Sequence, residues 1–372
     1  MSSKTSRGTV ERLLPSFSPV RAVAEDGVPL AAPEGYELPA DALLVDAFRR
    51  MVVGRRFDAQ ATVLTRQGRL AVYPSSRGQE ACQIASALAL REEDWLFPTY
   101  RDSVALLARG LDPVEILTLL RGEWHCGYDP AAWRTAPQCT PLATQTVHAV
   151  GLADALRRRG RGGVVLALVG DGGTSEGDFH EALNFAGVLG APVVFLVQNN
   201  GYAISVPLAR QSAAPALAFK GVGYGVASEQ VDGNDLVATL AVVASAVRRA
   251  RAGGGPFLVE AHTYRVEAHT NADDATRYRA EEEVARWRAA DPLARLERYL
   301  RGRGLLADGD VAAAEEEAER VAGGMRERLG GEMAGDPLEM FRHVFAEPTP
   351  QLAEQQALLA AELAADAEGG GR

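Results

Sequence analysis

Residues 170–178, Gly-Asp-Gly-Gly-Thr-Ser-Glu-Gly-Asp, combine four glycines with three acidic side chains. Glycine lets a backbone approach a phosphate group closely. A carboxylate placed directly against phosphate would repel it, but a Mg²⁺ ion between the two reverses the interaction. Mg²⁺ takes oxygen ligands and commonly uses one or two carboxylates together with phosphates. The pattern predicts a metal-bridged phosphate site, in which Asp171 binds the metal and Gly170, Gly172 and Gly173 permit close approach.

The other two acids of this stretch have a structural interpretation. Glu176 and Asp178 lie just before and at the start of a predicted helix. Acidic side chains are favourable there, because they cap free N–H groups and meet the positive end of the helix dipole. We therefore predict a capping role for both.

A strand, a helix and a second strand must position Asp171. Residues 163–170 and 192–198 are short apolar runs, and residues 178–190 between them have helical periodicity. Such a unit has parallel strands and a right-handed crossover. Ligands of open parallel sheets bind beyond the carboxyl ends of the strands. Asn200 follows the second strand, so Asp171 and Asn200 are expected to meet around one ligand.

The whole chain indicates an α/β protein with a central, mainly parallel sheet and helices on both faces. Residues 1–40 contain five prolines and predict an extended N-terminal arm. Residues 41–290 form the predicted α/β domain, in which a helix begins near Asp41 and a helix–strand pair spans 235–266. Residues 291–372 form a predicted helical C-terminal region.

Composition excludes several classes of partner. The 372 residues are 47% hydrophobic and 24% charged, as in a folded globular protein. A net charge of −10 opposes nucleic-acid binding. Cys82, Cys126 and Cys139 match no metal-binding spacing. No apolar run approaches the roughly 20 residues of a membrane span, and the first residues lack an apolar signal core. We predict a cytoplasmic protein without a nucleic-acid or membrane partner.

Several segments together resemble one enzyme family. Gly-Asp-Gly at 170–172, Asn-Phe-Ala-Gly at 184–187 and Gln-Asn-Asn at 198–200 are similar to the thiamine diphosphate-binding motif. The other segments that carry the resemblance are residues 67–81, 97–102, 140–145, 199–205, 231–235 and 264–274. From about Asp41 to the C-terminal helices, the chain resembles the alpha subunit of the thiamine diphosphate-dependent E1 component of 2-oxo acid dehydrogenase complexes. This resemblance implies the thiamine diphosphate-binding fold.

The resemblance also implies roles for particular residues. Mg²⁺ would be held by Asp171, Asn200 and the backbone carbonyl of Tyr202. The implied cofactor contacts are Tyr100, Arg101, Thr140, Leu142, Gly170, Asp171, Gly172, Gly173, Gln198, Asn200 and His269. His269 is the implied catalytic residue. Its loop differs from the family's usual form, because Ala268 and Thr270 stand where Gly and Ser are common, and a serine-based phosphorylation switch is not expected.

The implied reaction is oxidative decarboxylation of a 2-oxo acid, followed by transfer of the acyl group to a lipoyl group of the E2 acyltransferase. Pyruvate is the favoured substrate, with a branched-chain 2-oxo acid or acetoin as alternatives. The family's glutamate for the pyrimidine ring comes from a separate E1 beta subunit in an α2β2 heterotetramer. Two other interpretations stay open: a non-catalytic scaffold subunit of the same fold, and a complete single-chain thiamine enzyme.

Overall fold

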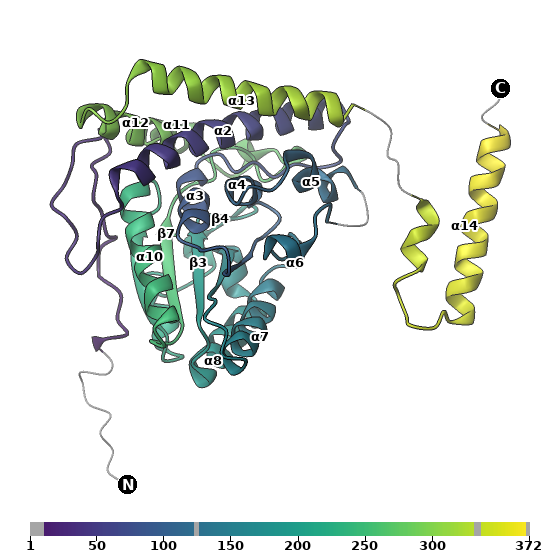
Figure 1. Ribbon diagram of the computed structural model, residues 1–372, viewed down its shortest axis with the longest axis horizontal. Helices are drawn as coiled ribbons and strands as arrows, with labels where there is room; N and C mark the ends of the chain where they lie inside the picture. Colours follow the sequence, from purple (N-terminus) through teal and green to yellow (C-terminus); the bar gives the residue numbers. More distant parts are fainter. Residues whose placement is uncertain (1–10, 123–125, 331–335, 370–372) are drawn as a thin grey trace, which may run out of the picture.

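The computed structural model describes residues 11–122, 126–330 and 336–369. Its centre is a five-stranded sheet in the order β1 (Trp95–Phe97), β2 (Val165–Gly170), β3 (Val193–Asn199), β7 (Phe257–His262) and β6 (Ala227–Asp232). Every neighbouring pair in this sheet is parallel. The predicted α/β class with a parallel sheet is confirmed, and Figure 1 shows the strands running through the centre of the body.

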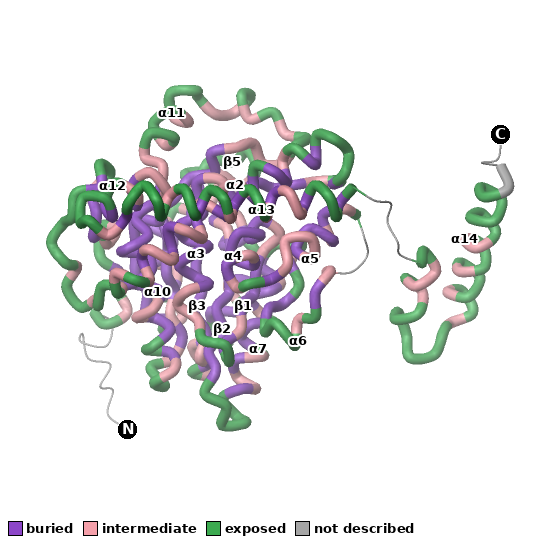
Figure 2. Tube along the Cα trace, turned by 45° about the horizontal axis from the view of Figure 1, so that its top comes forward, coloured by how far each residue is buried: buried purple, intermediate pink, exposed green. Residues whose placement is uncertain are grey.

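Helices cover both faces of the sheet, as the continuous apolar character of its strands requires. Alternate residues such as Leu166 and Leu168 face a core shared with α2 (Asp41–Arg66), α3 (Glu80–Leu88) and α10 (Leu236–Arg251). The residues between them, such as Val165 and Ala167, face a second core shared with α7 (Thr144–Arg158) and α8 (Gly177–Leu189). Both cores lie in the purple interior of Figure 2.

The remaining elements are short or lie toward the C-terminus. The helices are α4 (Ser103–Ala108), α5 (Pro113–Leu117), α6 (Pro130–Trp133), α9 (Phe219–Val222), α11 (Glu281–Ala289), α12 (Pro292–Gly302), α13 (Asp308–Arg328) and α14 (Pro350–Gly369). The 3-10 turns are η1 (Leu119–Arg121), η2 (Gly172–Ser175), η3 (Leu208–Arg210), η4 (Ala275–Arg277) and η5 (Pro337–Phe341). Strands β4 (Tyr202–Ala203) and β5 (Val206–Pro207) form an antiparallel hairpin.

The predicted strand–helix–strand unit is confirmed as β2, α8 and β3, and the first long helix begins at Asp41 as predicted. The sequence analysis did not predict two strands of the central sheet, β1 and β6. β1 has only three residues and stands directly before Pro98, which suggested a loop. β6, Ala-Ser-Glu-Gln-Val-Asp, is mostly polar and yet fully buried, so no apolar run indicated it.

The polar side chains of β6 are buried because the N-terminal arm covers them. Val20 forms a parallel bridge with Val231, and Ser16 donates from both its N–H and its hydroxyl to the Glu229 carboxylate. The backbone N–H groups of Ala22 and Val23 both donate to Asp235 at 2.7 Å. The described part of the arm is therefore hydrogen-bonded along the edge of the sheet.

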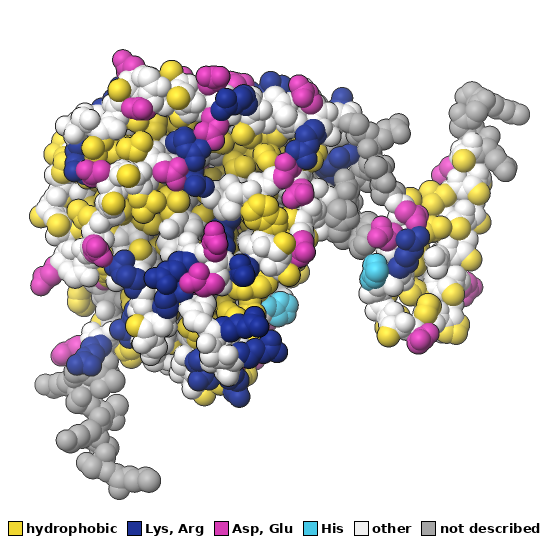
Figure 3. Space-filling model, in the orientation of Figure 1, with side chains coloured by type: hydrophobic (Ala, Val, Ile, Leu, Met, Phe, Trp, Pro, Cys, Tyr) yellow, Lys and Arg dark blue, Asp and Glu magenta, His cyan; other side chains and the backbone are white. Residues whose placement is uncertain are grey.

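The C-terminal helices take two positions. α13 packs along α2, and α12 packs against both α2 and α3. Figure 1 shows η5 and α14 standing apart from the body. Leu358 of α14 is 62% exposed, and yellow apolar side chains cover much of this helix in Figure 3, whereas basic and acidic side chains intermingle over the body. Within the described residues, no helix is both long and apolar enough to span a membrane.

Candidate functional site

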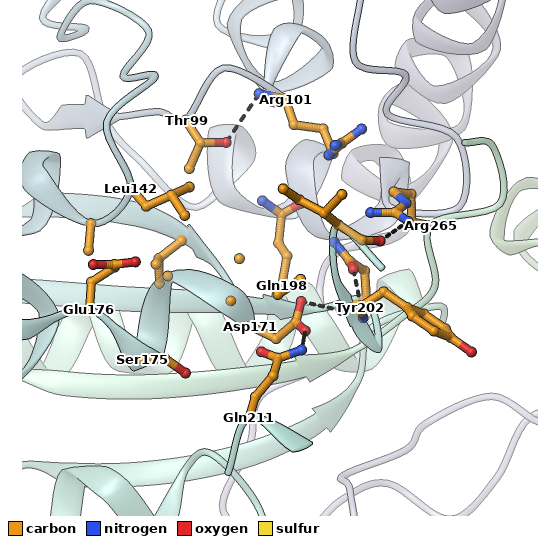
Figure 4. A pocket seen from close by; sticks show the side chains of 18 of the residues that line it. Thr99, Arg101, Leu142, Asp171, Ser175, Glu176, Gln198, Tyr202, Gln211 and Arg265 are labelled. Atoms are coloured by element: carbon orange, nitrogen blue, oxygen red, sulfur yellow. Dashed lines mark hydrogen bonds between the residues drawn. The ribbon is translucent and has the colours of Figure 1, made fainter. Parts of the chain in front are cut away.

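A cavity of about 420 Å³ opens at the carboxyl ends of four neighbouring strands. Tyr100 and Arg101 follow β1, Asp171 follows β2, Asn200 follows β3, and Arg265 follows β7. The cavity is also lined by Gln79, Thr99, Cys139, Leu142, Ala143, Gln145, Val169, Gly170, Gly172, Gly173, Ser175, Glu176, Gln198, Tyr202, Ala203, Ile204, Val206, Arg210, Gln211 and His269. This is the edge of a parallel sheet where ligands bind, and Figure 4 shows several of these side chains converging on it.

Asp171 and Asn200 lie in contact at this edge. The backbone N–H of Asn200 is 3.4 Å from Asp171 Oδ1, and the Asp171 side chain is almost fully buried. Asn200 Oδ1 lies 3.3 Å from the Tyr202 backbone nitrogen, so Tyr202 belongs to the same turn. Burial raises the pKa of Asp171, while hydrogen bonds from Gln211 and Asn200 oppose that rise. The structure thus brings together the three residues predicted to bind a metal.

The glycines among residues 170–173 differ in how much space a side chain would have at each position. A Cβ at Gly172 would lie 2.7 Å from Ala203 Cβ, and one at Gly173 would lie 2.7 Å from Val169 Cγ2. A Cβ at Gly170 would meet nothing within 4 Å. Gly172 and Gly173 therefore allow the protein to pack closely on itself. All three glycines also line the cavity, and their role in the approach of a ligand stays a prediction.

Arg101 and Arg265 converge on His269 inside the cavity. Arg101 Nη2 is 3.0 Å from His269 Nδ1 and also donates to the His269 backbone carbonyl at 3.0 Å. Arg265 Nη1 is 3.3 Å from the same Nδ1. Both guanidinium groups are largely buried. Two buried cations beside one histidine make this end of the cavity favourable for an anion.

The same contacts fix the protonation of His269. Burial, and then the positive charges of Arg101 and Arg265, lower the pKa of His269 to about 4. Near neutral pH the imidazole is therefore uncharged. Two cationic donors at Nδ1 require that atom to accept, which leaves the proton on Nε2.

The loop that carries His269 is held by neighbouring polar groups. The His269 N–H donates to Asp273 Oδ2 at 2.7 Å, and the Tyr278 hydroxyl donates to the same oxygen. Arg265 donates to the Tyr278 hydroxyl at 2.9 Å and to the Ile204 carbonyl at 2.7 Å. From the sequence, Arg265 is a candidate anchor of this loop through an ion pair with Asp273 or Asp274; in the structure it links the loop to the β4–β5 hairpin through the Tyr278 hydroxyl and the Ile204 carbonyl.

Of four further residues predicted to contact the cofactor, three line the cavity and one does not. Tyr100 lines the cavity, and its ring packs edge-on to His269 with 6.2 Å between centroids. Gln198 lines it too, but its amide donates to Asp102 at 2.7 Å, so the side chain is already engaged. Leu142 borders the cavity and is 45% exposed. Thr140 is exposed and is not among the residues that line the cavity, although its neighbours Cys139 and Leu142 are.

Three glutamines with a buried amide atom line the cavity, and they were not among the site residues predicted from the sequence. Gln79 Nε2, Gln145 Oε1 and Gln211 Oε1 are buried without a hydrogen-bond partner among the described residues. Buried polar atoms of this kind normally have a partner, so these atoms indicate a polar ligand. Gln79 and Gln145 stand in the 67–81 and 140–145 segments that carried the family resemblance, whereas nothing in the sequence distinguished Gln211.

The capping interpretation of Glu176 and Asp178 is only partly correct. Glu176 is the residue before α8, but its side chain makes no capping hydrogen bond and borders the cavity. Asp178 lies in the first turn of α8, and its carboxylate accepts a hydrogen bond from the Thr144 hydroxyl at 3.0 Å. Both acids lie at the predicted end of the helix, and neither caps it through its side chain.

The described residues contain no cluster of three or more His, Cys, Asp or Glu side chains that could hold a metal ion by itself. A metal at Asp171 would therefore need amide or carbonyl oxygens and oxygens of a ligand. Mg²⁺ fits such a donor set, because it is commonly bound by one or two carboxylates plus phosphates. The unpartnered glutamine atoms and the paired arginines fit a polar, anionic ligand in the same cavity.

Comparison with known proteins identifies relatives. The family described as dehydrogenase E1 component matches residues 48–322. The 3-methyl-2-oxobutanoate dehydrogenase subunit alpha of Mycobacterium tuberculosis is 46% identical over 349 residues, which cover 94% of this chain and 95% of the relative. The pyruvate dehydrogenase E1 component subunit alpha of Staphylococcus aureus is 40% identical over 293 residues, which cover 76% of this chain and 79% of the relative.

Proposed function

This chain belongs to the dehydrogenase E1 component family, and we propose that it is the alpha subunit of a thiamine diphosphate-dependent 2-oxo acid dehydrogenase. The observation that carries the proposal is the contact between Asp171 and Asn200 in the cavity that also contains His269. This arrangement provides oxygen ligands for Mg²⁺ at one end and cationic groups at the other. The cofactor would supply the carbanion chemistry, and the chain would bind and orient it.

The metal would be held by Asp171, by Asn200 Oδ1 and by the backbone carbonyl of Tyr202. Support comes from their proximity and from the burial of Asp171. A buried carboxylate is costly unless it is paired or binds a metal. A Mg²⁺ ion here would relieve that cost and would join the protein to the diphosphate.

Arg101, Arg265 and Tyr100 would form the anion-binding side of the site. The two guanidinium groups are buried, and their hydrogen-bond partners among the described residues are carbonyl oxygens, a hydroxyl and the His269 ring rather than carboxylates. An anion would supply the missing counter-charge. Arginine suits this role, because its planar guanidinium makes paired hydrogen bonds to oxyanions.

His269 would act as a neutral hydrogen-bond donor through Nε2. The arginine contacts at Nδ1 fix this tautomer, and the lowered pKa prevents a positive charge near neutral pH. A neutral imidazole can donate a hydrogen bond to negative charge that develops on the substrate while keeping its own proton.

For the substrate, we propose a branched-chain 2-oxo acid, with pyruvate as the second candidate. The sequence analysis favoured pyruvate. The branched-chain relative has the higher identity and covers more of the chain than the pyruvate relative. One methylene in an apolar pocket changes binding by only about 1–3 kcal/mol, so kinetic measurement must decide.

We further propose that an E1 beta subunit and an E2 lipoyl acyltransferase are partners. Only two acidic side chains, Asp171 and Glu176, are among the described residues that line the cavity. Asp171 would bind the metal, and Glu176 lies on the same loop, at the end of the cavity proposed for the metal and the diphosphate. Neither would then be the pyrimidine glutamate. A second chain would supply that carboxylate.

The test is an assay of the purified chain with and without an E1 beta subunit. Decarboxylation of 3-methyl-2-oxobutanoate and of pyruvate, and cleavage of acetoin, are followed with thiamine diphosphate, Mg²⁺ and a lipoyl domain as acceptor. We expect activity only with both subunits present, and the highest kcat/KM with the branched-chain acid. Activity of the isolated chain would support the single-chain enzyme, and inactivity of every combination would support a scaffold.

A further inference from the structure

The Asp171 carboxylate has a second neighbour that the proposed metal site does not use. Gln211 follows η3, and its Nε2 donates to Asp171 Oδ2 at 2.9 Å. The same Nε2 donates to the Val206 carbonyl at 2.9 Å. Figure 4 shows the Gln211 side chain pointing directly at the Asp171 carboxylate.

Gln211 makes the shorter of the two hydrogen bonds that the Asp171 carboxylate receives from other residues. The second comes from the Asn200 backbone at 3.4 Å, which is long for an N–H to oxygen hydrogen bond. Gln211 therefore fixes the orientation of the carboxylate. Because it engages Oδ2 strongly, it leaves Oδ1, on the side of Asn200, the less occupied oxygen.

The other end of the Gln211 amide also indicates a ligand. Gln211 Oε1 is buried and has no hydrogen-bond partner among the described residues, although the side chain lines the cavity. A buried carbonyl oxygen without a partner is rare in a native protein. A ligand, or water bound with it, would supply the missing donor.

We propose that Gln211 is a positioning residue for the divalent cation: it holds Asp171 as an oriented carboxylate and leaves Oδ1 available to the metal. This inference rests on the proposed function. Residues that hydrogen-bond to metal ligands orient them, and their replacement typically reduces metal affinity by 10–100-fold. No direct bond from Gln211 to the metal is part of the inference.

Two variants separate positioning from direct ligation. Gln211→Ala removes the donor to Asp171. Gln211→Glu keeps the shape but places a second carboxylate against Asp171. A positioning donor is lost in both variants, so both should weaken metal binding, whereas a direct ligand would be preserved or improved by glutamate.

The experiment measures the apparent Kd for Mg²⁺ at a fixed concentration of thiamine diphosphate. It uses the full-length chain purified with its beta subunit and follows binding by calorimetry. We expect the Kd to rise about 10–100-fold in Gln211→Ala and at least as much in Gln211→Glu. Gln355→Ala, on the exposed surface of α14, is the control and should leave the Kd unchanged.

The unfolding temperature without ligands is recorded for each variant, since Gln211 also contacts the hairpin through Val206. A fall in this temperature with an unchanged Mg²⁺ Kd would show that Gln211 is only a structural brace and would overturn the inference. An unchanged Kd in Gln211→Glu would overturn it equally. If the parent protein shows no Mg²⁺-dependent binding of thiamine diphosphate, the proposed function fails and this inference fails with it.

Discussion

Two loops that line the cavity are held in place by different forces. The loop after β2 is fixed by close packing, because Gly172 and Gly173 lie against Ala203 and Val169 with no room for a side chain. The loop after β7 is fixed by polar side chains. Arg279 donates to the carbonyls of Arg265, Val266 and Glu267, and its guanidinium lies 5.4 Å from the centre of the Tyr264 ring.

The difference between the two loops suits them to different roles in the site. The first loop packs against a strand end, so a change of pH or salt concentration should hardly alter its geometry. A stable geometry suits residues predicted to hold a metal and a diphosphate. A network of charges and hydroxyls gives the second loop a geometry that depends on each member. This suits a histidine whose protonation is set by its neighbours.

The largest expected effect is at the metal end of the first loop. Asp171→Asn should weaken Mg²⁺-dependent binding of thiamine diphosphate by about 100-fold or more, because a direct ligand should cost at least as much as the 10–100-fold known for residues around one. Calorimetric titration with Mg²⁺ measures it. Asp178→Asn, on the same segment but outside the cavity, is the control. Equal binding by parent and Asp171→Asn would remove the metal site.

Close packing of the first loop can be tested with two glycines. Gly172→Ala should lower the free energy of unfolding by about 1–3 kcal/mol, because the new methyl group meets Ala203 at 2.7 Å. Gly170→Ala has open space around it and should change that free energy by no more than about 1 kcal/mol. Urea denaturation monitored by circular dichroism gives the free energy of unfolding of each variant. A similar cost for both would contradict the packing argument.

The polar network of the second loop can be broken at Arg279. Arg279→Met keeps an unbranched, flexible side chain but removes its hydrogen bonds to three carbonyls. Loss of a partly buried, charged donor costs about 1.5–3 kcal/mol. We expect amide hydrogen exchange to accelerate by at least about tenfold across residues 265–273, while α8 is unaffected. The exposed Arg277 provides the control in Arg277→Met, which should leave exchange unchanged.

The smallest effect concerns the protonation of His269. Arg101→Gln removes one positive charge, so the pKa of His269 should rise from about 4 toward 6.5 but stop short of it, because burial is the larger cause. Since the folded-state pKa lies below the unfolded value, stability should fall as the pH decreases from 6.5 toward 4, and less steeply in the variant. NMR titration of the histidines, with His269→Gln for assignment, measures this pKa. An unchanged value would contradict the arginine contribution.

Local patterns in the sequence predicted the first loop well. The apolar runs of β2 and β3 and the helical periodicity of α8 are local signals, and parallel strands must end at the same edge of a sheet. The contact between Asp171 and Asn200 follows from that geometry alone. The metal-binding and catalytic roles of these residues stay predictions.

The sequence was less informative where distant segments cover or complete the site. The polar strand β6 is buried because the N-terminal arm packs on it, and no local pattern could indicate that cover. Thr140 was placed in the site by resemblance, yet it is exposed, while its neighbours Cys139 and Leu142 line the cavity. The direction of a side chain in an irregular segment depends on what packs against it.

By itself, the sequence determined the α/β class, the strand–helix–strand unit and the meeting of Asp171 with Asn200, because hydrophobic periodicity and strand direction are encoded locally. The tertiary structure decided which groups surround these residues. It brought Gln211 to Asp171, and it placed two arginines at one nitrogen of His269. The contacts of Gln211 with Asp171 and of Arg101 with His269 join segments 40 and 168 residues apart in the sequence, and their distances depend on how the whole sheet and its helices pack.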